Sequence, residues 1–195
     1  MNRPLKNPSR QGGFSMIEVM VSLIILLLGL LGLVGLIVVS QRAETESYQR
    51  SQALLLLQDM VGRINANRRV AACYAVTTDM VAGTPYLGKG SIIAPACGFG
   101  TSQANALATR DLTAWSGLLT GSAETLDGSN LGAMVGARGC VSFDVATGLY
   151  LVSVAWQGIA PTAAPGISLT CGMGLYGNEA LRRVVGTNVQ ITNLN

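Results

Sequence analysis

The sequence predicts an α+β protein in which a long N-terminal helix packs on a small, mostly antiparallel sheet. An apolar run begins near the N-terminus and continues as helix-forming sequence, and short alternating segments follow near the C-terminus. Of the 195 residues, 49% are hydrophobic and 12% are charged, against a usual charged share of about 25%. The low charge indicates that part of the chain's surface meets lipid or other protein.

The apolar run is long enough to span a membrane. Residues 19–39 contain no charged residue, and at about 1.5 Å per residue they extend roughly 30 Å, the thickness of the hydrocarbon core. A cleaved secretory signal has a shorter apolar region of roughly 7–15 residues. A plain signal anchor with a basic cytoplasmic segment explains residues 1–39 under the positive-inside rule, except for one residue, Glu18.

Glu18 is a carboxylate inside the apolar segment, where a charge costs on the order of 2.5–3.5 kcal/mol. Cleavage after Gly13 would create a positive α-amine on Phe14, four residues before Glu18. That amine and the carboxylate can neutralise each other, within one chain or between neighbours in a bundle. A misplaced subunit would leave a buried charge unpaired, so the pair would select the assembly register.

The segment Gly13-Phe14-Ser15-Met16-Ile17-Glu18-Val19 resembles the class III signal of type IV prepilins and pseudopilins. In that family a membrane peptidase cuts after the glycine and N-methylates the new phenylalanine, and the glutamate directs assembly. The resemblance implies processing at Gly13 and Phe14, an assembly role for Glu18, and a type IV pilin-like fold. It also implies a leader at 1–13 and a transmembrane, filament-core half of the helix at 14–40.

The helix is expected to continue through residues 41–69, which contain no proline and good helix formers. This second half would be the spine of a periplasmic head formed by residues 70–195. A stripe at helical spacing can lie on a sheet; its members are Ala53, Leu57, Met60, Val61 and Ile64.

The head is expected to contain an αβ-loop at 70–135 and a sheet region at 136–195. Within the loop, 70–105 is a connection and 111–119 a short amphipathic helix. Strands are predicted at 139–145, 149–156 and 181–192. In the second strand four residues alternate onto one side: Tyr150, Val152, Val154 and Trp156.

Four later segments resemble the PilV family, the "type IV pilus modification" minor pilins. They are residues 60–68, 136–140, 150–158 and 181–185. The resemblance implies a minor pilin that primes pilus assembly and takes part in tip-associated adhesion or twitching motility. Its partners would be other major and minor pilins, prepilin peptidase, the inner-membrane assembly platform and a large tip adhesin. The head would be periplasmic before assembly and on the pilus at the cell surface afterwards.

Four cysteines are present: Cys73, Cys97, Cys140 and Cys171. They form no CxxC pair, and the chain has no histidine, so we expect no zinc, haem or other cofactor. An even number beyond a membrane segment suits two disulfides in an oxidising compartment. Of the three pairings, local loop closure favours Cys73–Cys97 with Cys140–Cys171; four free buried thiols are the alternative.

The sequence offers no catalytic constellation, and we expect no enzyme. Residues 172–177 match GxGxxG, but too few residues follow for the dinucleotide fingerprint, so we expect a turn beside Cys171. Residues 127–130 lack the later ligands of a calcium loop and are also expected to form a turn. Arg182 and Arg183 are expected to be solvated at a strand edge, and Trp115 and Trp156 to lie in the core.

Charge argues against a nucleic-acid partner. Three of the thirteen basic residues lie in the leader, so ten basic residues face ten acidic ones in the mature chain. Two other functions are open: a minor pseudopilin of a type II secretion system, which has the same N-terminus, and a signal-anchored periplasmic binding protein or enzyme.

Overall fold

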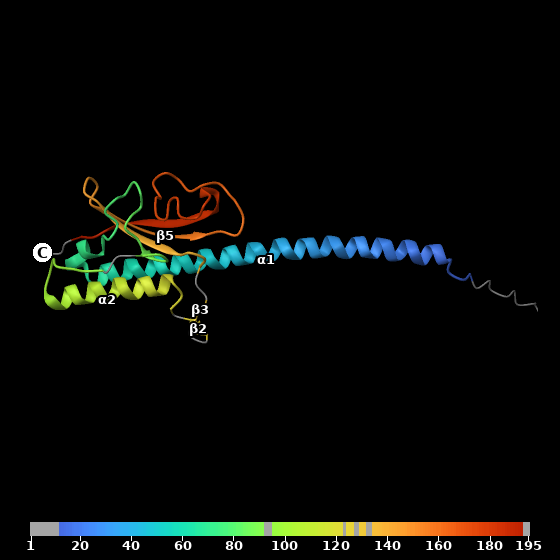
Figure 1. Ribbon diagram of the computed structural model, residues 1–195, viewed down its shortest axis with the longest axis horizontal. Helices are drawn as coiled ribbons and strands as arrows, with labels where there is room; N and C mark the ends of the chain where they lie inside the picture. The colour runs from blue at the N-terminus through green and yellow to red at the C-terminus, as the bar shows by residue number, and fades with distance from the viewer. Residues whose placement is uncertain (1–11, 92–94, 123, 127–128, 132–133, 193–195) are drawn as a thin grey trace, which may run out of the picture. The chain divides into compact units, whose positions relative to one another are not determined.

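The computed structural model describes residues 12–91, 95–122, 124–126, 129–131 and 134–192. The chain divides into two compact units, Met1–Glu44 and Thr45–Asn195, which we call the N-terminal unit and the head unit. Most of the expected leader, residues 1–11, lies outside the described residues. Figure 1 shows the elements by label and by colour along the chain.

Helix α1 (Met16–Ala66) is the long helix that the sequence predicts over residues 14–69. It has no internal proline, and its apolar run is rich in leucine, isoleucine and valine. The last predicted turn is different, because the chain continues as a 3-10 helix, η1 (Arg68–Tyr74). The expectation of a connection from residue 70 onward is therefore wrong for the residues of η1.

Helix α2 (Ser102–Leu119) begins nine residues before the predicted helix at 111–119. Thr101 caps it, since its hydroxyl accepts a hydrogen bond from the Ala104 amide at 3.3 Å. The helical turns before residue 111 contain the good helix formers alanine, leucine and arginine. The predicted loop up to residue 105 therefore ends earlier, at Thr101, where the helix cap stands.

The main sheet has four antiparallel strands in the order β1-β4-β5-β6. Their bounds are β1 (Leu87–Gly88), β4 (Arg138–Asp144), β5 (Leu149–Gln157) and β6 (Arg182–Gln190). The three strands predicted from sequence are confirmed with small shifts at their ends. A separate hairpin of β2 (Glu124–Leu126) and β3 (Ser129–Leu131), and a 3-10 turn, η2 (Glu179–Leu181), were not predicted.

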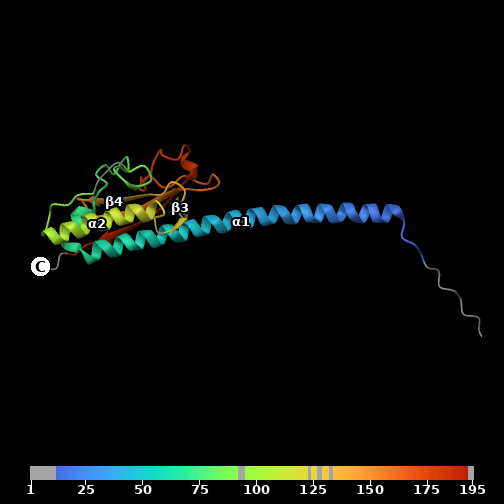
Figure 2. The ribbon, with the colours of Figure 1, turned by 60° about the horizontal axis from the view of Figure 1, so that its bottom comes forward.

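The core lies between this sheet and the helices. The alternating residues of β5 lie on one face, as predicted, and all four are buried. The head half of α1 contributes Ala53, Leu57, Met60 and Ile64 to the same core cluster, and Val61 packs against it half-buried. Figures 1 and 2 show the sheet over the head half of α1 with α2 beside that helix. The α+β architecture, a long helix on a small antiparallel sheet, is therefore confirmed.

Candidate functional site

The candidate processing site is the short extended segment just before α1. Gly13 and Phe14 are exposed, and Phe14 retains 86% of its accessible surface. A side-chain carbon added to Gly13 would meet no atom within 4 Å. The peptide bond between these two residues is therefore sterically open to a peptidase.

Glu18 lies in the first turn of α1. Its backbone N–H donates to the Ser15 carbonyl at 3.0 Å, which makes Ser15 the residue that starts the helix and Glu18 the third residue of its first turn. An acidic side chain there is favoured by the positive end of the helix dipole. Ser15 and Glu18 also match the S-x-x-E capping box, a local signal that the sequence reasoning did not use.

The Glu18 side chain is exposed and makes no ion pair with any residue that the structure describes. Inside lipid its charge therefore has no compensating cation in the described part of one chain. An α-amine created at Phe14 would be a new positive charge close to the start of the same helix. The pairing of this amine with Glu18 stays a prediction.

The apolar half of α1 presents an almost entirely apolar surface, interrupted by Glu18 and Ser22. All of α1 from Met16 to Val39 is exposed, including fifteen leucine, isoleucine and valine residues between 17 and 37 with exposed fractions from 46% to 72%. Among the described residues, α1 is the one helix long and apolar enough to cross a membrane, judged by length and composition. Such a surface needs lipid or other apolar helices around it.

Both disulfides of the head unit join the pairs that local loop closure favours. Cys73 bonds Cys97, and Cys140 bonds Cys171. The first pair links η1 to the segment before α2, and the second links β4 to the turns that follow residue 170. No described cysteine is free. These bonds connect elements of the head to each other.

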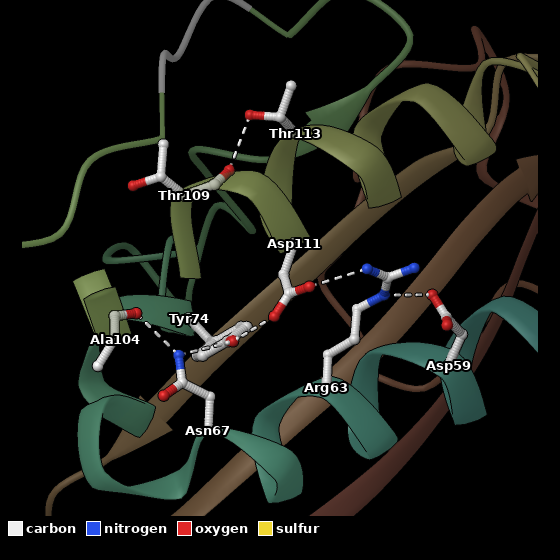
Figure 3. Close-up of polar contacts among 8 residues, drawn as sticks. All are labelled: Asp59, Arg63, Asn67, Tyr74, Ala104, Thr109, Asp111 and Thr113. Carbon is white, nitrogen blue, oxygen red and sulfur yellow. Dashed lines mark hydrogen bonds and ion pairs between the residues drawn. The ribbon is translucent and has the colours of Figure 1, made fainter. Parts of the chain in front are cut away.

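A polar cluster joins α1, η1 and α2, and Figure 3 shows it in close-up. Asp111, which is 8% exposed, accepts hydrogen bonds from Arg63 at 2.9 Å and from the Tyr74 hydroxyl at 2.6 Å. Arg63 also donates to Asp59 at 2.7 Å, and Asn67 donates to Tyr74 at 3.3 Å. Burial, with the Asp111 carboxylate beside it, raises the pKa of Tyr74. Every charge in the cluster is paired, so it can position helices but has no free acid or base for catalysis.

The prediction that Arg182 and Arg183 are solvated at a strand edge is wrong. Arg182 is 3% exposed and donates to Glu179 at 2.6 Å and to the carbonyl oxygen of Cys171 at 3.1 Å. Arg183 donates to Glu46 at 3.0 Å. Both guanidinium groups donate to carbonyl and carboxylate oxygens, which the turns around β6 and helix α1 bring close to them. This arrangement has no periodic signal in the sequence.

The remaining candidates in the head unit are structural. The GxGxxG segment forms turns beside Cys171, and Gly172, Gly174 and Gly177 have positive φ. Trp115 and Trp156 are buried in the core, as predicted. The possible calcium loop at 127–130 lies partly outside the described residues. Among described residues no group of three or more His, Cys, Asp or Glu side chains could hold a metal ion.

Residues 8–34 match the family model described as the prokaryotic N-terminal methylation motif. The matched segment contains Gly13, Phe14 and Glu18. No curated protein matches the chain, and no solved structure does. The motif indicates a prepilin substrate of the type IV pilin and pseudopilin kind. It points to a structural pilin rather than an enzyme, and the apolar helix that follows fits membrane anchoring and incorporation into a fibre.

Proposed function

We propose that the chain is a minor pilin of a type IV pilus. Prepilin peptidase cuts after Gly13 and methylates Phe14, and the apolar half of α1 then passes from the membrane into the core of the fibre. The observation that carries this proposal is the methylation motif at residues 8–34, which includes the processing residues and the start of α1. The apolar half of that helix is exposed and has one acid, Glu18, in its first turn.

The minor-pilin assignment rests on the resemblance of the head segments to the PilV family. By that resemblance the subunit primes assembly with other minor pilins, near the assembly platform of the inner membrane. It supports a large adhesin at the fibre tip and thereby contributes to attachment and twitching motility. Ion pairs such as Arg63–Asp111 and Arg183–Glu46 join separate segments of the head and support a structural rather than a catalytic role.

Mass spectrometry of the protein recovered from cells tests the processing step. We expect a mature chain that starts at Phe14 and carries one added methyl group on its α-amine. A chain that still begins at Met1, or one cut near Ser40, would contradict the proposal. A Gly13→Val variant is the control, because it should leave the leader attached while the head folds unchanged.

The second candidate function is a minor pseudopilin of a type II secretion system, because the methylation motif is common to both systems. A clean deletion of the gene separates them. Loss of piliation and twitching with normal export of secreted enzymes supports the pilus, and the reverse pattern supports the secretion system. A signal-anchored binding protein would change neither phenotype.

A further inference from the structure

Strand β6 is the free edge of the main sheet. It pairs with β5 through nine consecutive residue pairs, from Arg182 opposite Gln157 to Gln190 opposite Leu149, with no bulge. Apart from the pairing with β5, no backbone hydrogen bond joins residues 183–190 to another segment that the structure describes, and the Arg182 amide donates to the Glu179 carbonyl. One side of this strand therefore presents unpaired N–H and C=O groups, which is a template for another strand.

Natural proteins usually protect such an edge by shortness, charge, proline or a bulge. The opposite edge, β1, is only two residues long. From Val184 to Gln190, by contrast, β6 has no charged residue and no proline, and its register is continuous. The sheet is thus protected at one edge and open at the other.

The inner face beside this edge is incompletely covered. Val185 and Val189 are only half-buried, although Val154 and Tyr150, which pair with them on β5, are buried. A hollow of about 360 Å³ lies at this flank, between α1 and β6. Its lining residues are Glu46, Ser47, Arg50, Trp156, Arg183, Val184 and Val185.

Helix α1 continues this surface with an apolar residue. Leu54 is one turn beyond Arg50 on the same face of the helix, and it is 42% exposed. We call the hollow, Leu54 and the free edge of residues 184–190 the edge groove. Its lining mixes the apolar side chains of Trp156, Val184 and Val185 with charged ones, and its wall is an unpaired strand. This combination suits an extended peptide.

We propose that an extended segment of a different subunit of the fibre adds to the sheet as a fifth strand beside β6. Its inward side chains are apolar and cover Val185, Val189 and Leu54. Main-chain hydrogen bonds to β6 hold it, and alternate side chains determine which segment fits.

A charge at one end of the edge groove defines the partner further. Arg50 is exposed and makes no ion pair with a described residue, whereas the nearby Glu46 is already bound by Arg183. An acidic residue near that end of the added strand would pair with Arg50. The expected partner strand is therefore apolar on one face, with a carboxylate near one end.

A second copy of the chain does not fit as the source of the added strand. Antiparallel pairing of β6 with itself needs a two-fold axis normal to the sheet, which reverses every direction in the sheet plane. The N-terminal ends of the two head halves of α1 would then point in opposite directions, whereas two anchors in one membrane point the same way. The choice of a different fibre subunit as the partner rests on the proposed function, whereas the observation that β6 has an open edge does not.

The experiment uses the full chain in detergent micelles and blocked synthetic peptides of about ten residues, in which valine alternates with threonine and glutamate stands near one end. Hydrogen exchange measured by mass spectrometry should slow in residues 182–190 when peptide is added. Two further peptides carry N-methyl groups on the odd or on the even residues. Because only one set of amides faces β6, one methylated peptide should lose binding and the other should retain it.

If both methylated peptides bind alike, or if none of the peptides protects β6 at millimolar concentration, strand addition is wrong. If the micellar protein is dimeric and β6 is protected without peptide, the occupant is a second copy and the proposed partner is wrong. The mass of the mature N-terminus is independent of these results, so failure here is distinguishable from failure of the proposed function.

The charge assignment has its own test in the same assay. Replacing the peptide glutamate by lysine should weaken binding about two- to fivefold, the range of an exposed ion pair. Arg50→Glu should reverse this preference, and Arg110→Glu, the same change at an exposed position of α2, should leave it intact. An unchanged preference in Arg50→Glu would overturn the pairing with Arg50.

Discussion

Gly139 decides how closely α2 approaches the sheet. It lies in β4, and a side-chain carbon placed on it would collide with the ring of Trp115 and with Leu119. Both residues are fully buried on α2. The absence of a side chain at this one position therefore lets the largest aromatic residue of the helix lie directly on the sheet.

We expect Gly139→Ala to lower the free energy of unfolding of the head by about 1–3 kcal/mol, because the added methyl group overpacks this contact. Urea unfolding of the full chain in micelles, followed by tryptophan fluorescence, measures the change. Gly62→Ala is the matched control. Nothing lies within 4 Å of that position on α1, and alanine there should stabilise by about 1 kcal/mol. Equal effects of the two variants would contradict the packing argument.

Glu46 makes the stability of the head depend on pH. Partial burial raises its pKa, but hydrogen bonds from Arg183 and from the Ile159 and Ala160 amides outweigh this and lower it below the ordinary value. A carboxyl group with a lowered pKa stabilises the fold above its unfolded pKa, and this stability is lost as pH falls through the folded pKa.

We therefore expect the head to lose stability as the pH falls from about 5 to below the pKa of Glu46. Glu46→Gln should reduce the loss by about 1 kcal/mol, because the amide has no charge to titrate. Denaturant unfolding at neutral and acidic pH gives the difference. The pKa values of Asp144 and Glu179 are also lowered, so part of the dependence should persist in the variant. A variant with the wild-type pH profile would exclude Glu46 as a contributor.

At the scale of elements, Asp111 connects its own helix, α2, to both α1 and η1. It receives one hydrogen bond from Arg63 of α1 and one from Tyr74 of η1, and it lies on α2 itself. Its removal would leave a buried tyrosine hydroxyl and a partly buried guanidinium without their acceptor. The cluster in Figure 3 therefore sets the position of α2 against the end of α1.

Asp111→Ala should destabilise the head by about 2–4 kcal/mol. Arg110→Ala changes the adjacent, exposed residue and should alter stability by less than about 0.5 kcal/mol. Chemical unfolding of both variants in micelles makes the comparison. If the Asp111 variant is as stable as the Arg110 variant, the cluster does not hold the helices together.

At the scale of the whole molecule, Glu18 concerns assembly rather than folding. Glu18→Val should leave membrane insertion and cleavage after Gly13 largely intact. It should reduce incorporation into fibres by roughly tenfold or more, because a buried amine then lacks its partner at a cost of several kcal/mol. Quantitative immunoblotting of sheared fibres and of membranes measures both steps.

Glu44→Val is the matched control for that experiment. It makes the same substitution in the same helix, at an exposed position beyond the apolar run. We expect normal incorporation of this variant. Normal piliation with Glu18→Val would show that the pairing role is wrong, even if the mature chain starts at a methylated Phe14.

The sequence alone predicted the features that depend on local periodicity. The apolar run of α1 and the alternation from Tyr150 to Trp156 both repeat along the chain, so the helix and the strands could be recognised without tertiary contacts. Gly13, Phe14 and Glu18 are likewise adjacent in sequence, and their chemistry can be read directly from the chain.

The tertiary structure alone decided which distant charged residues meet and which strand lies at the open edge of the sheet. Arg182 and Arg183 are ordinary surface residues by composition, and only the turns around β6 and the approach of Glu46 bury and pair them. The open edge of β6 likewise follows from strand order, which periodicity does not encode. Secondary structure arises from near-neighbour patterns that the sequence contains, whereas these contacts depend on how packed elements exclude water, and that is determined by the complete fold.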